Sequence, residues 1–180
     1  MTLIWFNSAL FFELLAAGGF IVFIIKQQQW VFRISYWILV AGLICHTFFL
    51  GYRYYLLGTV PVLDLKSALS VFAWSIIGVY LIIQARFKLR VLGSFVAPFA
   101  AFLMIVSSVM PWKTGPVNPL YKSLWLTVHV GTIFIGDGLL AIAFLAAIMY
   151  LIQERQIKQK RLGSIYTRLP SLATLDRINY

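Results

Sequence analysis

Residues 123–153, SLWLTVHVGTIFIGDGLLAIAFLAAIMYLIQ, form a long, almost entirely apolar segment of the chain. It contains no Lys or Arg, and Asp137 is its only acidic residue. A helix needs about 20 apolar residues to cross a bilayer, because it rises about 1.5 Å per residue. This stretch is longer than that, so we predict a transmembrane helix that tilts or projects beyond the lipid.

Four further stretches are long and apolar enough to form membrane helices. They are Leu3–Ile25, Ile34–Gly51, Ala68–Gln84 and Val91–Val109. The 180-residue chain is 62% hydrophobic and has only five acidic residues, which excludes a soluble domain of this size. We therefore predict an all-α, polytopic membrane bundle of about five transmembrane helices over residues 1–153, followed by a tail at residues 154–180.

The distribution of Lys and Arg predicts the orientation. Eleven of the fifteen basic residues follow the first, third and fifth stretches. The other four lie on the opposite side: Arg53, Lys66, Lys113 and Lys122. The positive-inside rule then places the N-terminus outside and the C-terminus in the cytoplasm, and we expect a multi-pass protein of a bacterial inner (cell) membrane. The net charge of +10 is explained in this way, which excludes a nucleic-acid-binding protein.

The polar tail has two interpretations that the sequence leaves open. Leu169, Leu172, Leu175 and Ile178 recur at helical spacing. They favour an amphipathic segment along the inner membrane surface. The alternative is a tail that is disordered or ordered only by a partner.

The two histidines lie at the same depth in the membrane if the second and fifth stretches run in opposite directions. His46 lies near the outer end of one stretch, and His129 near the outer end of the other. Imidazole is a common protein ligand of haem iron, so the two histidines could form a site with an imidazole on each side of the iron. The alternative for His129 is a hydrogen bond to a loop in a tight helix contact.

Arg53 follows His46 by two helical turns, on the same face of its helix. At the outer boundary its guanidinium could bind an acidic ligand group such as a haem propionate, or a lipid phosphate. Glu13 and Asp137 are carboxylic acids within membrane stretches, where such groups either mark a proton path or serve as hydrogen-bonded structural acids. No hydrolase triad, P-loop or dinucleotide motif is present, so the sequence indicates no enzymatic activity of its own.

Three segments, in this order, resemble one known family. They are His46-Thr47 through Arg53, Gly58 and Pro61 to Leu69–Trp74; Pro119-Leu120 through Ser123, Trp125-Leu126 and His129-Val130; and the tail Tyr166–Tyr180. Together they resemble the cytochrome c assembly proteins of the CcsA/ResC type, including the HemX-like branch. The resemblance runs from the second stretch to the last residue.

The resemblance implies a role in moving haem to the outer face of the membrane and presenting it to apocytochrome c. His129 matches the external histidine that precedes the family's Trp-rich haem segment, so it would be an axial ligand of haem b. Trp125 lies in the same motif and would contact the haem. Arg53, with Lys113 or Lys122, would meet the propionates.

The chain also departs from the family pattern. A Trp-rich segment and a second external histidine are absent, and the chain has Gly136-Asp137 where relatives often have Gly-Tyr. The chain thus resembles the family's N-terminal half, as a split subunit, a shortened product or a piece of a longer chain. Other cytochrome c assembly membrane subunits would then supply the rest of the haem site, and the chain would meet apocytochrome c indirectly, as part of a haem-lyase complex.

A second hypothesis is a non-catalytic membrane scaffold or regulator of tetrapyrrole metabolism, as the resemblance to the HemX-like branch implies. The cytoplasmic tail would then be the active part. A small-solute transporter fits less well, because five spans do not form the two equal halves typical of transporters.

Overall fold

The computed structural model describes residues 1–112 and 118–158. Within these ranges the chain forms five long α-helices: α1 (Thr2–Lys26), α2 (Gln29–Leu57), α3 (Leu65–Phe87), α4 (Gly93–Val109) and α5 (Leu124–Lys158). Two short 3₁₀ turns, η1 (Arg90–Leu92) and η2 (Pro119–Tyr121), precede α4 and α5. All five α-helices are long and apolar enough to cross a membrane, which confirms the prediction of an all-α, five-span membrane bundle.

The helix ends follow local backbone chemistry. Gln27 ends α1 and Gly58 ends α2, each in the left-handed region with φ of 54° and 67°. Asp64 caps the N-terminus of α3, where its carboxylate accepts a hydrogen bond of 2.7 Å from the backbone N–H of Ser67. Both α2 and α3 are longer than the predicted stretches at each end. Arg53, which follows the predicted stretch 34–51, lies within α2.

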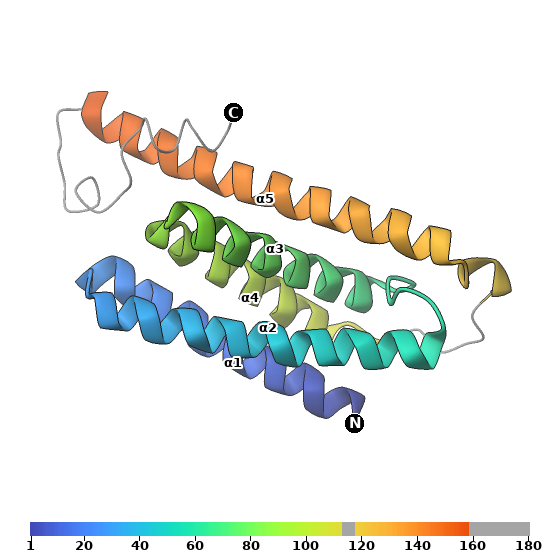
Figure 1. Ribbon diagram of the computed structural model, residues 1–180. Helices are drawn as coiled ribbons and strands as arrows, with labels where there is room; N and C mark the ends of the chain where they lie inside the picture. The colour runs from blue at the N-terminus through green and yellow to red at the C-terminus, as the bar shows by residue number, and fades with distance from the viewer. Residues whose placement is uncertain (113–117, 159–180) are drawn as a thin grey trace.

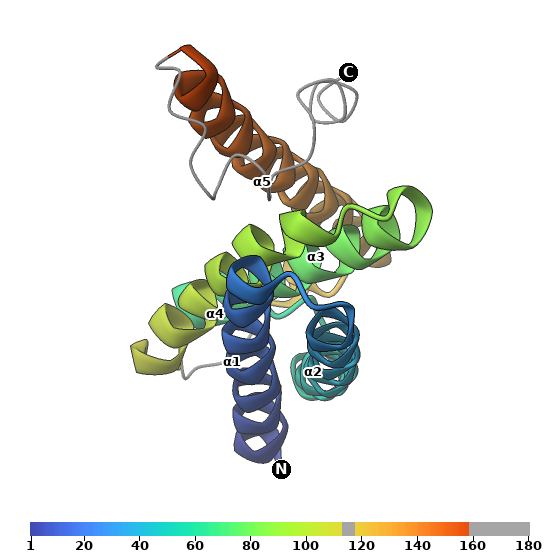
Figure 2. The ribbon, with the colours of Figure 1, turned by 90° about the vertical axis from the view of Figure 1, so that its left-hand side faces the viewer.

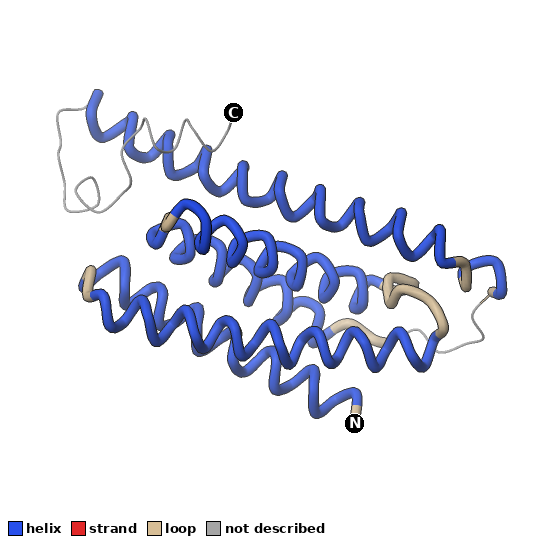
Figure 3. Tube along the Cα trace, in the orientation of Figure 1, coloured by secondary structure: helices blue, strands red, loops and turns tan. Residues whose placement is uncertain are grey.

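The helices alternate in direction, and their connections gather at two ends (Figure 1). The N-terminus, the α2–α3 connection and the start of α5 lie at one end, which we call the Arg53 end. The tight α1–α2 and α3–α4 turns lie at the other end, as does the end of α5 (Figure 3). This alternation agrees with the predicted topology. The side of the membrane that each end faces stays a prediction from charge.

The core forms where α1, α2, α3 and α4 pack together. Its largest fully buried side chains are Phe6, Phe20, Phe23, Leu39, Phe49, Ile76, Ile77, Tyr80, Leu92 and Met104, together with Ile142 and Met149 of α5. The fifth helix joins this core from one side: α5 packs chiefly against α3 and leans away from α1 and α2 (Figure 2). It runs on to Lys158, past the predicted boundary at Gln153. The predicted amphipathic segment at residues 164–180 lies outside the described residues.

The contact between α5 and α3 depends on a glycine. A Cβ atom at Gly138 would lie 2.5 Å from the Oγ of Ser75 and 3.2 Å from its carbonyl carbon. The Ser75 hydroxyl also donates a hydrogen bond to the backbone oxygen of Phe134 in α5. Such small-residue contacts hold membrane helices together, because they allow the two backbones to approach closely.

We expect Gly138→Ala to lower the free energy of unfolding by about 1–3 kcal/mol, because the added methyl group overpacks this contact. The matched control is Gly136→Ala, since a Cβ atom at Gly136 would meet nothing within 4 Å. The measurement is an unfolding titration of both variants in detergent. Equal stability of the two variants would contradict the expectation.

Candidate functional site

The Arg53 end carries a cluster of charged and aromatic side chains from three parts of the fold. The guanidinium of Arg53 in α2 lies 3.8 Å from the Asp64 carboxylate and 3.5 Å from the Ser67 hydroxyl. Its Cζ lies 4.3 Å from the centre of the Trp112 ring, just after α4. The Nε atom of Arg53 is buried and meets no acceptor among the described residues. Arg53 is thus held by long contacts and keeps an unused donor.

Lys66 is the second cation of this cluster. Its ammonium group donates hydrogen bonds to the backbone oxygens of Ser108 and Met110, at 3.1 and 3.2 Å. It also lies 4.6 Å from the centre of the Trp112 ring, so this ring contacts two cations. Lys66 is buried, and it ties the start of α3 to the end of α4. Arg53 and Lys66 together outnumber the one nearby carboxylate, Asp64, which favours an anionic group at this end.

His129 and Trp125 both lie near the start of α5 and are exposed, Trp125 to 77%. The segment before them is tied to the α2–α3 connection. The Thr59 hydroxyl donates a hydrogen bond of 2.5 Å to the backbone oxygen of Tyr121, and a Cβ atom at Gly58 would lie 3.6 Å from the Lys122 side chain. His129, Trp125 and Lys122 therefore share an end of the bundle with Arg53. Lys113 lies outside the described residues.

His46 lies in a buried polar network that joins three helices. Its Nδ1 is 2.7 Å from the Glu13 carboxylate in α1, and its Nε2 is 2.8 Å from the Ser70 hydroxyl in α3. Both His46 and Glu13 are fully buried. Since both ring nitrogens have partners, iron ligation by His46 would require the loss of one of these hydrogen bonds.

The structure does not pair His46 with His129. His46 is enclosed by α1 and α3, whereas His129 is exposed on α5, which packs chiefly on α3. Among the described residues there is also no group of three or more His, Cys, Asp or Glu side chains that could hold a metal ion. A single imidazole can serve as one axial ligand of a haem, with the second supplied by another chain.

The residues at the Arg53 end fit part of a haem site. Exposed His129 offers an imidazole, and the partly exposed guanidinium of Arg53 offers donors for a carboxylate group. Sequence reasoning missed Lys66 and Trp112 as members of the cluster. Lys66 precedes the third predicted membrane stretch and Trp112 follows the fourth, so both lie at the same predicted membrane boundary as Arg53. This shared boundary was the signal in the sequence that could have placed them in one cluster.

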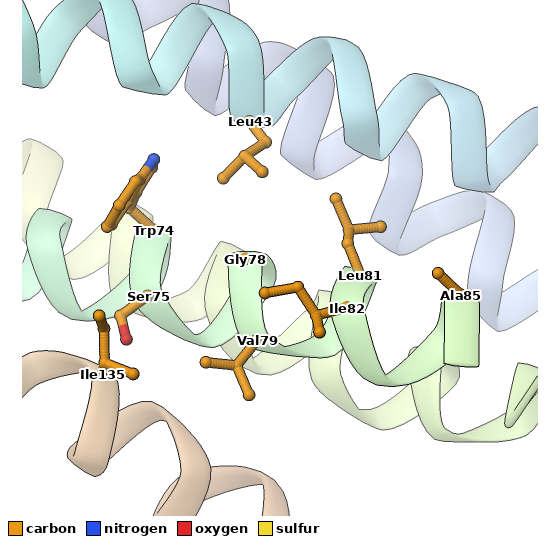
Figure 4. A pocket seen from close by; sticks show the side chains of 9 residues that line it. All are labelled: Leu43, Trp74, Ser75, Gly78, Val79, Leu81, Ile82, Ala85 and Ile135. Carbon is orange, nitrogen blue, oxygen red and sulfur yellow. The ribbon is translucent and has the colours of Figure 1, made fainter. Parts of the chain in front are cut away.

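A separate apolar groove runs along α3 between α2 and α5, with a volume of about 460 Å³ (Figure 4). Leu43 of α2 and Ile135 of α5 stand on its two sides, and Trp74, Gly78 and Ile82 of α3 form its floor. The residues that line it carry no ionisable group. This surface suits lipid tails or another helix, rather than a metal or a charged ligand.

Comparison with known proteins places the chain in a family. The family described as "Cytochrome C assembly protein" matches residues 62–180. "Cytochrome c biogenesis protein CcsA" of Guillardia theta is 26% identical over 176 residues, which cover 87% of this chain and 58% of the relative. "Protein HemX" of Brevibacillus brevis is 26% identical over 158 residues, which again cover 87% of this chain and 58% of the relative. CcsA of Porphyra purpurea is 32% identical over 110 residues, 59% of this chain and 34% of the relative.

These relatives are considerably longer than this chain, which spans at most 58% of the two that it covers best. The family match covers both the motif around His129 and the start of α3, where Asp64 and Lys66 lie. The match of the family over more than half of the chain, together with the five membrane helices, shows that this multi-pass membrane protein belongs to the cytochrome c assembly protein family.

Proposed function

We propose that this chain is a haem-handling membrane component of cytochrome c biogenesis, which holds haem at the outer face of a bacterial cell membrane. The observation that carries the proposal is that exposed His129 and the partly exposed guanidinium of Arg53 lie at the same end of the bundle. The family relationship supports a role in cytochrome c assembly. Haem is the cargo here, and its iron would bind the imidazole of His129.

In this proposal each residue of the site has a separate task. His129 is the axial ligand, and Trp125 covers one edge of the porphyrin. Arg53 pairs with a propionate through the part of its guanidinium that stays accessible, since its side chain is 14% exposed and its contact with Asp64 is long. Lys122, which lies against Gly58, provides a further cation near the same connection.

The proposal also includes a partner. This chain offers one exposed imidazole for the iron, so a second axial ligand and a cover for the haem would come from another membrane subunit of the assembly system. That subunit would hand the haem to apocytochrome c, as part of a haem-lyase complex.

Labelling of single cysteines tests the predicted sidedness on which the proposal depends. In a Cys45→Ser background, Leu120→Cys places a thiol at the Arg53 end and Phe87→Cys at the opposite end; both positions are exposed, to 80% and 61%. We expect a membrane-impermeant maleimide to label position 120 in intact cells, and position 87 only after permeabilisation. The reverse pattern would contradict the proposal, because the imidazole would face the cytoplasm.

A second candidate function is that of a non-catalytic scaffold or regulator of tetrapyrrole metabolism. It is favoured by the match to HemX, which covers as much of this chain as the match to CcsA of Guillardia theta. Deletion of residues 164–180 discriminates between the two functions. Loss of function with unchanged haem binding would favour the scaffold, whereas an unaffected function would favour the haem-binding role.

A further inference from the structure

The first four turns of α5 have little packing against the rest of the bundle. None of the residues 124–137 is buried, and the buried residues of α5 begin at Gly138. His129 thus lies in a part of the helix that the core does not enclose. A contact with α3 lies five residues after it, about 7.5 Å along the helix axis: the Ser75 hydroxyl donates a hydrogen bond to the backbone oxygen of Phe134.

A helix that is held at one contact can tilt about that contact. A tilt of about 15° about Phe134 would move His129 by about 2 Å. Arg53 would not follow, because α2 is held by its packing against α1 and α3. A ligand that contacts both His129 and Arg53 needs a fixed separation between them, within about 0.5 Å. The site therefore requires a second contact that holds α5 on the other side of His129.

The connection between α2 and α3 supplies this second contact. The Thr59 hydroxyl donates a hydrogen bond of 2.5 Å to the backbone oxygen of Tyr121, and Thr59 is only 2% exposed. The preceding residue lies against the next one along, since a Cβ atom at Gly58 would be 3.6 Å from the Lys122 side chain. Gly58 is the C-cap of α2, so this contact begins five residues after Arg53.

A short, ordered turn transmits this contact to α5. The Asn118 side chain accepts a hydrogen bond of 3.0 Å from the backbone N–H of Leu120. The backbone N–H of Lys122 donates to the Pro119 oxygen at 3.1 Å, which closes the η2 turn. Only Lys122 and Ser123 separate η2 from the start of α5. The position of Tyr121 therefore restricts where α5 can begin.

We infer that Thr59 is a positioning residue of the proposed haem site. Its hydrogen bond to Tyr121 holds the start of α5 and so fixes the separation of His129 from Arg53. The inference rests on the proposed function, in which both of these residues contact one haem. Thr59 itself contacts no haem in this arrangement and acts only through the position of α5.

Distances between spin labels test the positioning in the full chain without haem. In a Cys45→Ser background, one label is placed at Tyr55→Cys in α2 and the other at Val128→Cys beside His129; these positions are 81% and 61% exposed. Thr59→Val removes the hydroxyl and keeps the shape of the side chain. We expect it to broaden the distance distribution by about 2 Å, the displacement given by a tilt of α5. Thr59→Ser keeps a hydroxyl and should keep the narrow distribution.

A label pair at the other end of the bundle is the matched control. Phe87→Cys in α3 and Leu151→Cys in α5 are 61% and 60% exposed. Their distance distribution should not change in Thr59→Val, because the second half of α5 is held by its own buried residues. An unchanged distribution between positions 55 and 128, or equal broadening of both pairs, would overturn the inference.

Haem titration of the same variants separates positioning from general stability. We expect Thr59→Val to lower the haem affinity about two- to tenfold, the range that corresponds to one lost hydrogen bond. In an Arg53→Leu background it should have no effect on affinity, because the separation matters only to a ligand that contacts both residues. An equal loss of affinity in both backgrounds would indicate a merely weakened fold and would overturn the inference.

Failure of the inference can be distinguished from failure of the proposed function. Absence of haem binding by the unsubstituted chain would overturn both. An unchanged distance distribution in Thr59→Val, in a chain that binds haem through His129, would overturn the inference alone.

Discussion

Glu13→Leu is expected to be among the most destabilising single substitutions in this protein, lowering the free energy of unfolding by about 3–5 kcal/mol. The Glu13 carboxylate lies 2.7 Å from the Nδ1 of His46, and both side chains are fully buried. Leucine removes one partner and leaves the imidazole without its acceptor inside an apolar core. An unfolding titration in mixed detergent micelles measures the effect.

The double variant Glu13→Leu/His46→Leu distinguishes the effect of an unpaired polar group on stability from the effect of changed packing around the pair. Replacing both members of a buried pair by apolar side chains costs far less than removing one, so we expect the double variant to be more stable than Glu13→Leu alone. Glu154→Gln is the control, because it removes the charge from a partly exposed ion pair of 2.7 Å with Lys158 and should change stability little. Wild-type stability of Glu13→Leu would show that the pair does not hold α1 and α2 together.

His129→Ala is expected to lower the haem affinity of the purified protein by at least about tenfold, equivalent to about 1.4 kcal/mol. The imidazole is the proposed iron ligand, and alanine removes it from an exposed position of α5 without disturbing the core. Absorbance titration with haem, followed at the Soret band, gives the measurement. Added imidazole should restore part of the band, because the exposed position leaves room for a free ligand.

Substitution of His46 provides the comparison for this experiment. His46→Gln should destabilise the protein yet leave the Soret band of the folded fraction unchanged, since both ring nitrogens of His46 serve the buried network. Arg53→Leu should weaken haem binding by less than His129→Ala, and Arg86→Leu, an exposed charge at the opposite end, should have no effect. An unchanged titration in His129→Ala would remove this residue from the haem site.

The sequence predicted the membrane helices well because each depends on a local property. An apolar stretch of sufficient length forms a helix in lipid whatever its neighbours are, since its backbone groups must be satisfied within the segment. All five predicted stretches lie within or overlap the observed helices. The errors lie at the ends of the helices. Helix α2 continues past Arg53 and ends at its Gly58 cap, and α3 begins at its Asp64 cap, before Lys66.

The arrangement of the candidate site could be predicted only in part. That Arg53 and His129 share an end of the bundle followed from their positions along the chain. The contacts of Lys66 with Trp112 did not follow, because the two residues are joined through the packing of α3 on α4. The depth of His46 was also insufficient to predict its role, since the same depth is compatible with a ligand and with a buried structural side chain.

The number of helices among the described residues, their alternation and the end at which the candidate residues lie follow from the sequence, because length and hydropathy act along the chain. Which side chains meet depends on the tertiary structure. Glu13 and His46 pair because α1 approaches α2 closely at Gly42, where a Cβ atom would lie 3.3 Å from Glu13 Cγ. The rotation of each helix about its axis sets such contacts, and that rotation is fixed by packing between helices rather than by any one helix.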